Sequence, residues 1–262
     1  MLNEIHAVLE GLKLRHTRDV IAEALQEAQR KKPSYSTFLL NLMRSELGDK
    51  RNRQIAGRIK HSGLDEYWTL ETFPWNLQPC LARYRKEIME IAELDFLDKG
   101  ESVVLIGKPA VGKSGLASGI LMKALYGGRT GRAIKAQDLF EQLGASLADR
   151  TTKRLLGELC RLDLLLIEEF GYANPLSQVQ INNFFRLMDS RANKKNCVVS
   201  TNLGFQEWSK FLGNGPVTAA LLSRLLQKCH VFTFALDAVN LREPKFKLPA
   251  RAEIPSILKA CQ

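Results

Sequence analysis

One eight-residue pattern constrains the fold of this chain more than any other feature of its sequence. An apolar run at residues 103–106 is followed directly by residues 107–114, which have the form G-x-x-x-x-G-K-S. Apolar residues then recur at helical spacing at Leu116, Ile120 and Leu121. Strand, glycine-rich loop and helix in this order form a P-loop, in which main-chain N–H groups and a helix N-terminus face phosphate groups. The pattern predicts a nucleoside triphosphate site in an α/β fold.

Each residue type in this loop has a chemical role. The amine of Lys113 reaches the β- and γ-phosphates, and the Ser114 hydroxyl is an oxygen ligand suited to Mg²⁺. We therefore expect ATP and Mg²⁺ as cofactors. The predicted nucleotide-binding residues are Gly107, Lys108, Pro109, Ala110, Val111, Gly112, Lys113, Ser114 and Gly115.

The apolar pattern on either side of the loop predicts the architecture. From residue 81 onward, strands are expected at 103–106, near 133, and at 164–168, 197–201 and 231–234, with helices at 113–126, 137–147, 151–161, 177–193 and 218–228. This alternation is typical of a parallel α/β sheet with flanking helices.

Residues 1–63 carry helical patterns only. A third helix starts near Ser34, and its pattern resumes from Lys50 to Lys60 before Gly63, a candidate C-cap. We expect a small all-helical domain at 1–63, a linker at 64–80, the α/β domain at 81–243 and a basic tail at 244–262. The linker is aromatic, and we expect it to pack on the next domain rather than stack on bases.

The charge balance indicates a polyanionic partner. The net charge is +10, and residues 30–60 hold nine basic residues against two acidic ones. This cluster is either a DNA-contacting face or a solvated helix face. The five cysteines are far apart without a C-x-x-C pair, and no run reaches the length of a membrane span. We expect a cytoplasmic protein that does not enter membranes. The candidate DNA contacts in the cluster are Lys50, Arg51, Arg53, Arg58 and Lys60.

Two adjacent acids end the predicted strand at 164–168. Glu168 is expected to hold Mg²⁺, and Glu169 to act as the base that orients the attacking water. Aspartate is the usual residue at the first position, so the extra methylene of Glu168 predicts slower hydrolysis or a switch-like use of ATP.

Two further polar residues complete the predicted site. Asn202 follows the strand at 197–201, where it can bridge the γ-phosphate and the attacking water, or else cap the next turn. Arg224 lies on an amphipathic helix and is a candidate arginine finger for an adjoining subunit, with an intrachain salt bridge as the alternative.

Several segments together resemble a known family. They are 168–172 (EEFGY), 200–208 (STNLGFQEW), 222–226 (LSRLL) and 241–243 (LRE). Across roughly residues 1–245 the chain resembles IstB, the helper ATPase of insertion-sequence transposition, which shares a branch of the AAA+ superfamily with the helicase loader DnaC and the initiator DnaA. At Asn202 the resemblance implies the position called sensor 1. Lys108, Ala110, Ser114, Glu168 and Ser223 depart from the family's usual residues.

The resemblance implies an AAA+ ATPase that forms a homo-oligomer on duplex DNA, with ATP sites shared between subunits, and recruits and stimulates a cognate transposase. In this branch a helical insertion after the second strand contacts DNA, which adds Arg150, Lys153 and Arg154 as candidates. The motif does not fix the role of Arg242. Two alternatives stay open: a DnaC-like replicative helicase loader, and a module that binds ATP without turnover.

Overall fold

The computed structural model describes residues 1–242 except 92, 173–175, 193, 214 and 236, so the expected basic tail at 244–262 lies outside the described residues. The chain divides into two compact units, Met1–Gly57 and a larger unit that begins at Arg58. Within the described residues, no helix is both long and apolar enough to cross a membrane.

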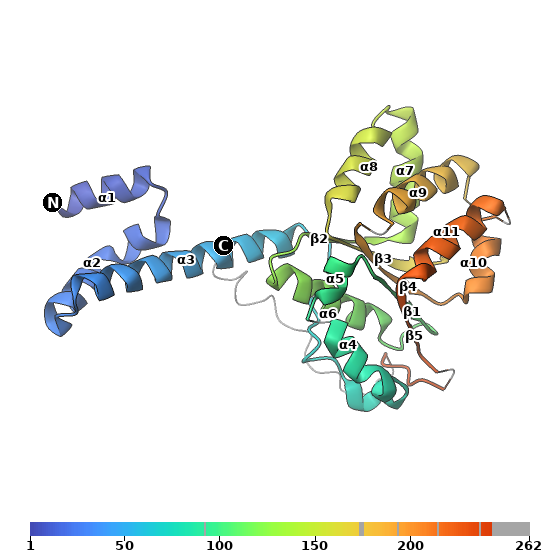
Figure 1. Cartoon of the computed structure of the whole chain (residues 1–262), viewed down its shortest axis with the longest axis horizontal. Helices are drawn as coiled ribbons and strands as arrows, with labels where there is room; N and C mark the ends of the chain where they lie inside the picture. Colours follow the sequence, from blue (N-terminus) through green and yellow to red (C-terminus); the bar gives the residue numbers. More distant parts are fainter. Residues whose placement is uncertain (92, 173–175, 193, 214, 236, 243–262) are drawn as a thin grey trace. The chain divides into compact units, whose positions relative to one another are not determined.

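The first unit is helical, as its sequence pattern predicts. It contains α1 (Leu2–Gly11), α2 (Arg15–Lys31) and most of α3 (Tyr35–Lys60). The expected interruption before Lys50 is wrong, because α3 is one continuous helix (Figure 1).

Three contacts support the middle of α3. The buried Glu46 carboxylate accepts a hydrogen bond from the Thr17 N–H at 2.7 Å, which caps the start of α2, and Arg53 pairs with both Glu46 and Asp49. The Asp49–Arg53 pair has the i,i+4 spacing that supports a helix. These contacts offset the roughly 1 kcal/mol that Gly48 costs inside the helix. Local pattern alone did not show the contact between Thr17 and Glu46, because Thr17 belongs to another helix.

The second unit is built on a five-stranded parallel sheet in the order β2-β3-β4-β1-β5. The predicted parallel α/β sheet is confirmed. The strands are β1 (Ser102–Ile106), β2 (Gly131–Lys135), β3 (Leu164–Phe170), β4 (Asn196–Thr201) and β5 (Cys229–Thr233).

Helices cover both faces of this sheet. Figure 1 shows α7 (Ala136–Ala148), α8 (Thr152–Arg161), α9 (Gln178–Arg191), α10 (Phe205–Phe211) and α11 (Pro216–Gln227) on one side. On the other side lie α4 (Arg85–Ile91), α5 (Asp95–Lys99) and α6 (Lys113–Tyr126), preceded by the short 3-10 helices η1 (Trp75–Leu77) and η2 (Pro79–Tyr84). The sequence pattern missed α10, whose seven residues are too few to show a helical period.

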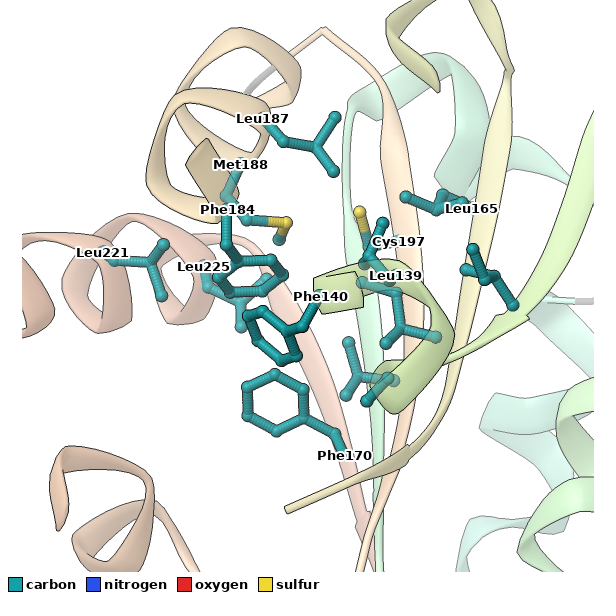
Figure 2. Close-up of a cluster of buried hydrophobic side chains, with 14 of the residues drawn as sticks. Leu139, Phe140, Leu165, Phe170, Phe184, Leu187, Met188, Cys197, Leu221 and Leu225 are labelled. Atoms are coloured by element: carbon teal, nitrogen blue, oxygen red, sulfur yellow. The ribbon is translucent and has the colours of Figure 1, made fainter. Parts of the chain in front are cut away.

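One hydrophobic core lies between the sheet and the helices α7 to α11 (Figure 2). Aromatic rings fill its centre: the Phe170 ring lies 4.4 Å from Trp208 and 5.7 Å from Phe184, centroid to centroid. Phe140 of α7 lies 5.1 Å from Phe184. Since Phe170 follows the two acids of β3, this packing anchors the end of the strand that carries them.

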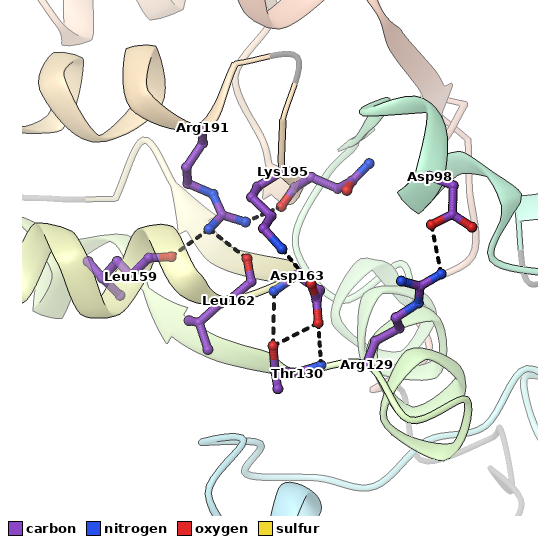
Figure 3. A network of polar contacts seen from close by, with 9 residues as sticks. Asp98, Arg129, Thr130, Leu159, Leu162, Asp163, Arg191 and Lys195 are labelled. Atoms are coloured by element: carbon purple, nitrogen blue, oxygen red, sulfur yellow. Dashed lines mark hydrogen bonds and ion pairs between the residues drawn. The ribbon is translucent and has the colours of Figure 1, made fainter.

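Polar contacts fix the opposite, amino-terminal end of the sheet (Figure 3). Asp163, just before β3, accepts hydrogen bonds from the Thr130 N–H at 2.9 Å, the Thr130 hydroxyl at 2.8 Å and the Lys195 amine at 2.6 Å. Burial raises the pKa of Asp163, but the bonds from Lys195 and Thr130 outweigh it and lower the pKa to about 2. One carboxylate thus aligns the starts of β2, β3 and β4.

Candidate nucleotide-binding site

The glycine-rich loop runs from β1 to α6, as predicted. Gly112 has φ 103° at the N-cap of α6, and a Cβ on Gly107 would lie 2.7 Å from the Cβ of Phe234. Both positions therefore require glycine. Ala110 has φ 64°, a left-handed conformation that costs an L-residue about 1–2 kcal/mol.

Lys113 folds its amine over the loop. The Nζ atom donates to the carbonyl oxygens of Gly107 and Lys108, both at 2.7 Å. Burial and then the positive charge of Arg242 lower the pKa of Lys113 to about 8, while Glu169 opposes them. A cation disfavoured in this way gains from binding an anion, so the electrostatics of the loop suit a phosphate.

The two predicted metal ligands lie together. The Ser114 hydroxyl at the start of α6 hydrogen-bonds the half-buried Glu168 carboxylate on β3. Burial, and to a lesser extent the charge of Glu169, raise the pKa of Glu168, whereas the bond from Ser114 lowers it. A hydroxyl and a carboxylate converging on one point are hard oxygen donors of the kind that Mg²⁺ accepts.

A bulge in β3 sets the position of the second acid. The register between β3 and β4 shifts between Ile167 and Phe170, and Glu169 has φ 56° within this shift. Its N–H donates to the Ser200 hydroxyl at 3.2 Å, while its side chain is exposed. Bulges commonly re-aim side chains next to active sites, and non-glycine residues with positive φ cluster there. The bulge frees the Glu169 carboxylate from regular strand alternation.

Asn202 directly follows β4, the strand between β3 and β1. Its Oδ1 atom is buried and accepts no hydrogen bond within the described part of the chain. The alternative that Asn202 caps the next turn is wrong, because Thr201 Oγ1 accepts from the Leu203 N–H at 3.0 Å and Glu207 Oε2 from the Gly204 N–H at 2.7 Å. An unpaired buried amide oxygen beside the loop has hydrogen-bonding capacity left for a ligand or water.

Arg224 lies near the amino-terminal ends of the strands, at the opposite end of the sheet from the P-loop. It pairs with Asp189 of α9, so the intrachain salt bridge considered as an alternative is present. Both side chains remain more than half exposed, at 56% and 61%. Arg224 lines a pocket together with Ser102 and Lys195, which lie at the amino-terminal ends of β1 and β4, whereas the P-loop follows the carboxyl end of β1. Arg224 and the chain's own P-loop therefore lie at opposite ends of the strands.

The candidate DNA-binding residues are on two helical segments. On α3, Lys50, Arg51 and Lys60 are exposed and Arg58 is partly buried, whereas Arg53 is engaged with Glu46 and Asp49. At the start of α8, Arg150, Lys153 and Arg154 are exposed, and Arg154 lies 4.0 Å from Glu158. Except for Arg53, these groups are placed where a phosphate backbone can approach them.

The aromatic linker packs against the loop's helix, as its composition predicts. Trp68 and Phe73 are buried, the Trp68 N–H donates to the Ser118 hydroxyl at 3.3 Å, and that hydroxyl donates to the Glu66 carbonyl at 2.8 Å. A pocket of about 150 Å³ results. Its lining combines the linker, the loop and the chain after β5: Glu66, Trp68, Phe73, Pro74, Ala110, Gly112, Lys113, Ser114, Gly115, Leu241 and Arg242.

Sequence reasoning did not place the linker aromatics or Leu241 and Arg242 in this site. The only signal for Arg242 was the short L-R-E segment, which fixes no role by itself. The nearness of residues so far apart in the chain depends on the order of the strands, which the local pattern does not contain.

The chain is similar in sequence to known ATP-binding proteins. The family of IstB-like ATP-binding proteins matches residues 7–245. The ATP-binding protein of insertion sequence IS21 from Pseudomonas aeruginosa is 28% identical over 244 residues, which span 93% of this chain and 91% of that relative. The ATP-binding protein of insertion sequence IS5376 from Geobacillus stearothermophilus is 30% identical, over 82% of this chain and 84% of its own length.

Solved structures share the fold of the second unit. The crystal structure of the DnaC helicase loader aligns with a TM-score of 0.52 at 18% identity, over 66% of this chain and 97% of that one. The replication initiator DnaA, bound to AMPPCP and single-stranded DNA, aligns with a TM-score of 0.53 at 19% identity, over 73% of this chain and 59% of DnaA. These likenesses show that the second unit has the same α/β fold as those structures. With its P-loop, its paired acids and a family match over nearly its whole length, the chain belongs to the IstB-like ATP-binding proteins associated with insertion sequences.

Proposed function

We propose that this chain is an ATPase whose ATP state controls its assembly on duplex DNA and its recruitment of a partner transposase. The observation that carries the proposal is the convergence of five polar side chains at the carboxyl ends of β1, β3 and β4: Lys113, Ser114, Glu168, Glu169 and Asn202. The names of the relatives, ATP-binding proteins of insertion sequences, support a role in transposition.

Each side chain has a definite task in hydrolysis. Lys113 and the loop N–H groups bind the β- and γ-phosphates. Ser114 and Glu168 are the residues that would hold Mg²⁺, which when bound neutralises phosphate charge. Glu169 accepts a proton from the attacking water on its carboxylate, and the unpaired Oδ1 of Asn202 orients that water. The linker aromatics Trp68 and Phe73 cover the loop and exclude bulk water.

The same proposal requires a homo-oligomer. Arg224 lies at the amino-terminal edge of the sheet, so it supplies its guanidinium to the ATP of an adjoining subunit and must leave Asp189 to do so. We further propose that the functional division of the chain is a helical DNA- or partner-binding domain at 1–63, a linker at 64–80, and the ATPase domain at 81–243. The compartment is the reducing cytoplasm; Cys80, Cys160, Cys197 and Cys229 are free thiols.

ATP hydrolysis by purified variants tests the chemistry. Lys113→Ala should abolish nucleotide binding, whereas Glu169→Gln should bind ATP normally and lose about 10²–10⁴-fold in turnover. Glu90→Gln, an exposed acid on α4, is the matched control and should behave as the original chain. Normal turnover by Glu169→Gln would rule out its assignment as the base. Undetectable turnover by the original chain, under conditions where it binds ATP and DNA, would favour the module that binds ATP without hydrolysis.

Mixing two inactive variants tests the trans arrangement. Arg224→Ala should bind ATP yet fail to hydrolyse it, since each site lacks its neighbour's guanidinium. Adding Lys113→Ala should restore part of the activity, because a Lys113→Ala subunit supplies an intact Arg224 to an intact P-loop. Absence of any rescue across a range of mixing ratios would show that Arg224 does not act between subunits.

Fluorescence anisotropy tests whether DNA is a partner, and it distinguishes the transposition helper from the replicative helicase loader. Duplex and single-stranded probes are each titrated with ATP, ADP or no nucleotide, at two salt concentrations. ATP-dependent binding to duplex supports the transposition helper, whereas preference for single strands favours a helicase loader. Lys153→Ala with Arg154→Ala should weaken binding at every sequence and reduce the salt dependence, if these residues contact phosphates. If the two changes together leave DNA binding unaltered, the start of α8 does not contact DNA.

A further inference from the structure

The chain segment after β5 returns to the P-loop and is attached there by a buried amide. Gln78, which is fully buried, donates from Nε2 to the carbonyl oxygen of Val111 at 2.9 Å and to that of Val239 at 2.6 Å. Its Oε1 accepts from the Val239 N–H at 3.2 Å. One side chain of the linker region therefore joins the P-loop to residues 237–242, which we call the return segment.

A second attachment lies further along the return segment. The Leu241 N–H donates to the Ala110 carbonyl at 2.8 Å, and a Cβ on Gly112 would lie 3.0 Å from Leu241 Cδ1. The Arg242 N–H donates to Asn240 Oδ1 at 3.0 Å, which closes a turn at this point. Because its backbone is held directly on the loop, the return segment presents the next side chain to the site at a defined position.

That side chain is Arg242. It lines the 150 Å³ pocket together with Lys113 and Ser114, which face the phosphates, and with the linker aromatics. The acid in the lining, Glu66, accepts a hydrogen bond from the Trp68 indole at 2.9 Å. Two cations on one small pocket repel each other unless an anion lies between them. A guanidinium is also the side chain best shaped to bind phosphate oxygens with two parallel hydrogen bonds.

We propose that Arg242 is a second cationic ligand of the nucleotide's phosphates, supplied by the same subunit as Lys113, and that Gln78 positions it through the return segment. The proposal rests on the proposed function only in requiring that a nucleotide binds this P-loop. In this arrangement the subunit that binds the nucleotide supplies Arg242 in cis, and the adjoining subunit supplies Arg224 in trans. It also makes phosphate binding depend on docking of the return segment.

Equilibrium titration with fluorescent ATP and ADP analogues tests the role of Arg242. The variants are made in the Arg224→Ala background, so that no guanidinium acts between subunits. Arg242→Ala should weaken binding about ten- to a hundredfold, the value of one charged hydrogen bond, and Arg242→Lys should recover part of it. Arg129→Ala, at a partly exposed arginine that precedes β2 and pairs with Asp98, is the matched control and should bind as the parent does.

The pattern of losses decides the outcome. A loss for ATP alone assigns the guanidinium to the γ-phosphate, and equal losses for ATP and ADP assign it to the phosphates nearer the ribose; both support the proposal. Binding of both nucleotides by Arg242→Ala within twofold of the parent would overturn it. Lys113→Ala identifies the other kind of failure, since normal binding by that variant would disprove the nucleotide site itself rather than the role of Arg242.

The positioning role of Gln78 is tested by coupling. Gln78→Glu keeps the acceptor for Val239 but loses both donated bonds, and should weaken ATP binding when Arg242 is present and have little further effect in Arg242→Ala. Asn240→Ala is a second variant at an exposed position that does not threaten folding, and should show the same dependence. Equal weakening with and without Arg242 would overturn the positioning role.

Discussion

Arg191 is a buried cation whose hydrogen bonds, within the described part of the chain, all go to main-chain oxygens, and its replacement tests how the end of the sheet is stabilised. The side chain is 1% exposed, and its guanidinium donates to the carbonyls of Leu159 at 2.5 Å, Leu162 at 3.0 Å and Asn196 at 2.6 Å (Figure 3). These acceptors lie at the end of α8, before β3 and at the start of β4. Each charged hydrogen bond is worth about 1.5–3 kcal/mol, and removing the buried charge returns a few kcal/mol of desolvation.

We therefore expect Arg191→Met to lower the free energy of unfolding by about 3–5 kcal/mol. Arg191→Lys should lose at least as much, since a single amine keeps the buried charge but does not span acceptors on three segments. Urea denaturation of each variant measures the change, with m-values compared to check that the denatured state is unaffected. A loss below about 1 kcal/mol for Arg191→Lys would refute the reasoning, because it would show that charge rather than fork geometry stabilises the junction.

Four further changes have defined outcomes. Burial lowers the pKa of His230, but bonds to Glu101 at 2.9 Å and Glu87 at 2.8 Å raise it above its usual value, so His230→Gln should lose stability below about pH 6.5. That loss should disappear as pH rises through the raised pKa; urea titrations at pH 6 and pH 9 measure it, and an equal loss at both would contradict the ion-pair account. Gly112→Ala should abolish binding of a fluorescent ATP analogue, because φ is 103° and the new Cβ meets Leu241 at 3.0 Å; retained binding would show that the loop adapts. Gly63→Ala should destabilise the folded protein by more than about 1 kcal/mol, since φ is 68° and the new Cβ would lie 2.6 Å from the Ala133 carbonyl oxygen. Gly48→Ala, inside α3, should instead stabilise it by about 0.5–1 kcal/mol. Thermal melts in which Gly63→Ala is the more stable of the two variants would contradict both assignments.

Much of the second unit could be predicted because its signals are local. The helix predicted at 113–126 has those limits in the structure, and each of the five expected strands is present within two residues. Buried parallel strands are short apolar runs between turns, and a P-loop is a contiguous pattern, so both are visible in a single stretch of sequence. The paired acids Glu168 and Glu169 were found for the same reason.

The features missed depend on contacts between distant residues. The continuity of α3 relies on Thr17 and Glu46, and the short α10 is held by Trp208 in a core assembled from several helices. The bulge at Glu169 follows from how β3 pairs with β4, not from the residues of β3 alone. None of these has a repeating pattern along the chain, so the period of apolar residues carries no information about them.

The sequence by itself determined that a phosphate-binding loop, two acids and a polar strand end occur in the order of an AAA+ fold, because each motif is set by neighbouring residues. The tertiary structure decided which side chains meet there. It placed Arg224 near the amino-terminal ends of the strands, paired with Asp189. It also placed Arg242 beside the P-loop, where Gln78 hydrogen-bonds both the loop and the return segment. The physical reason is that parallel strands are ordered by packing and by main-chain hydrogen bonds across the sheet, and this order brings together residues that are far apart in the chain.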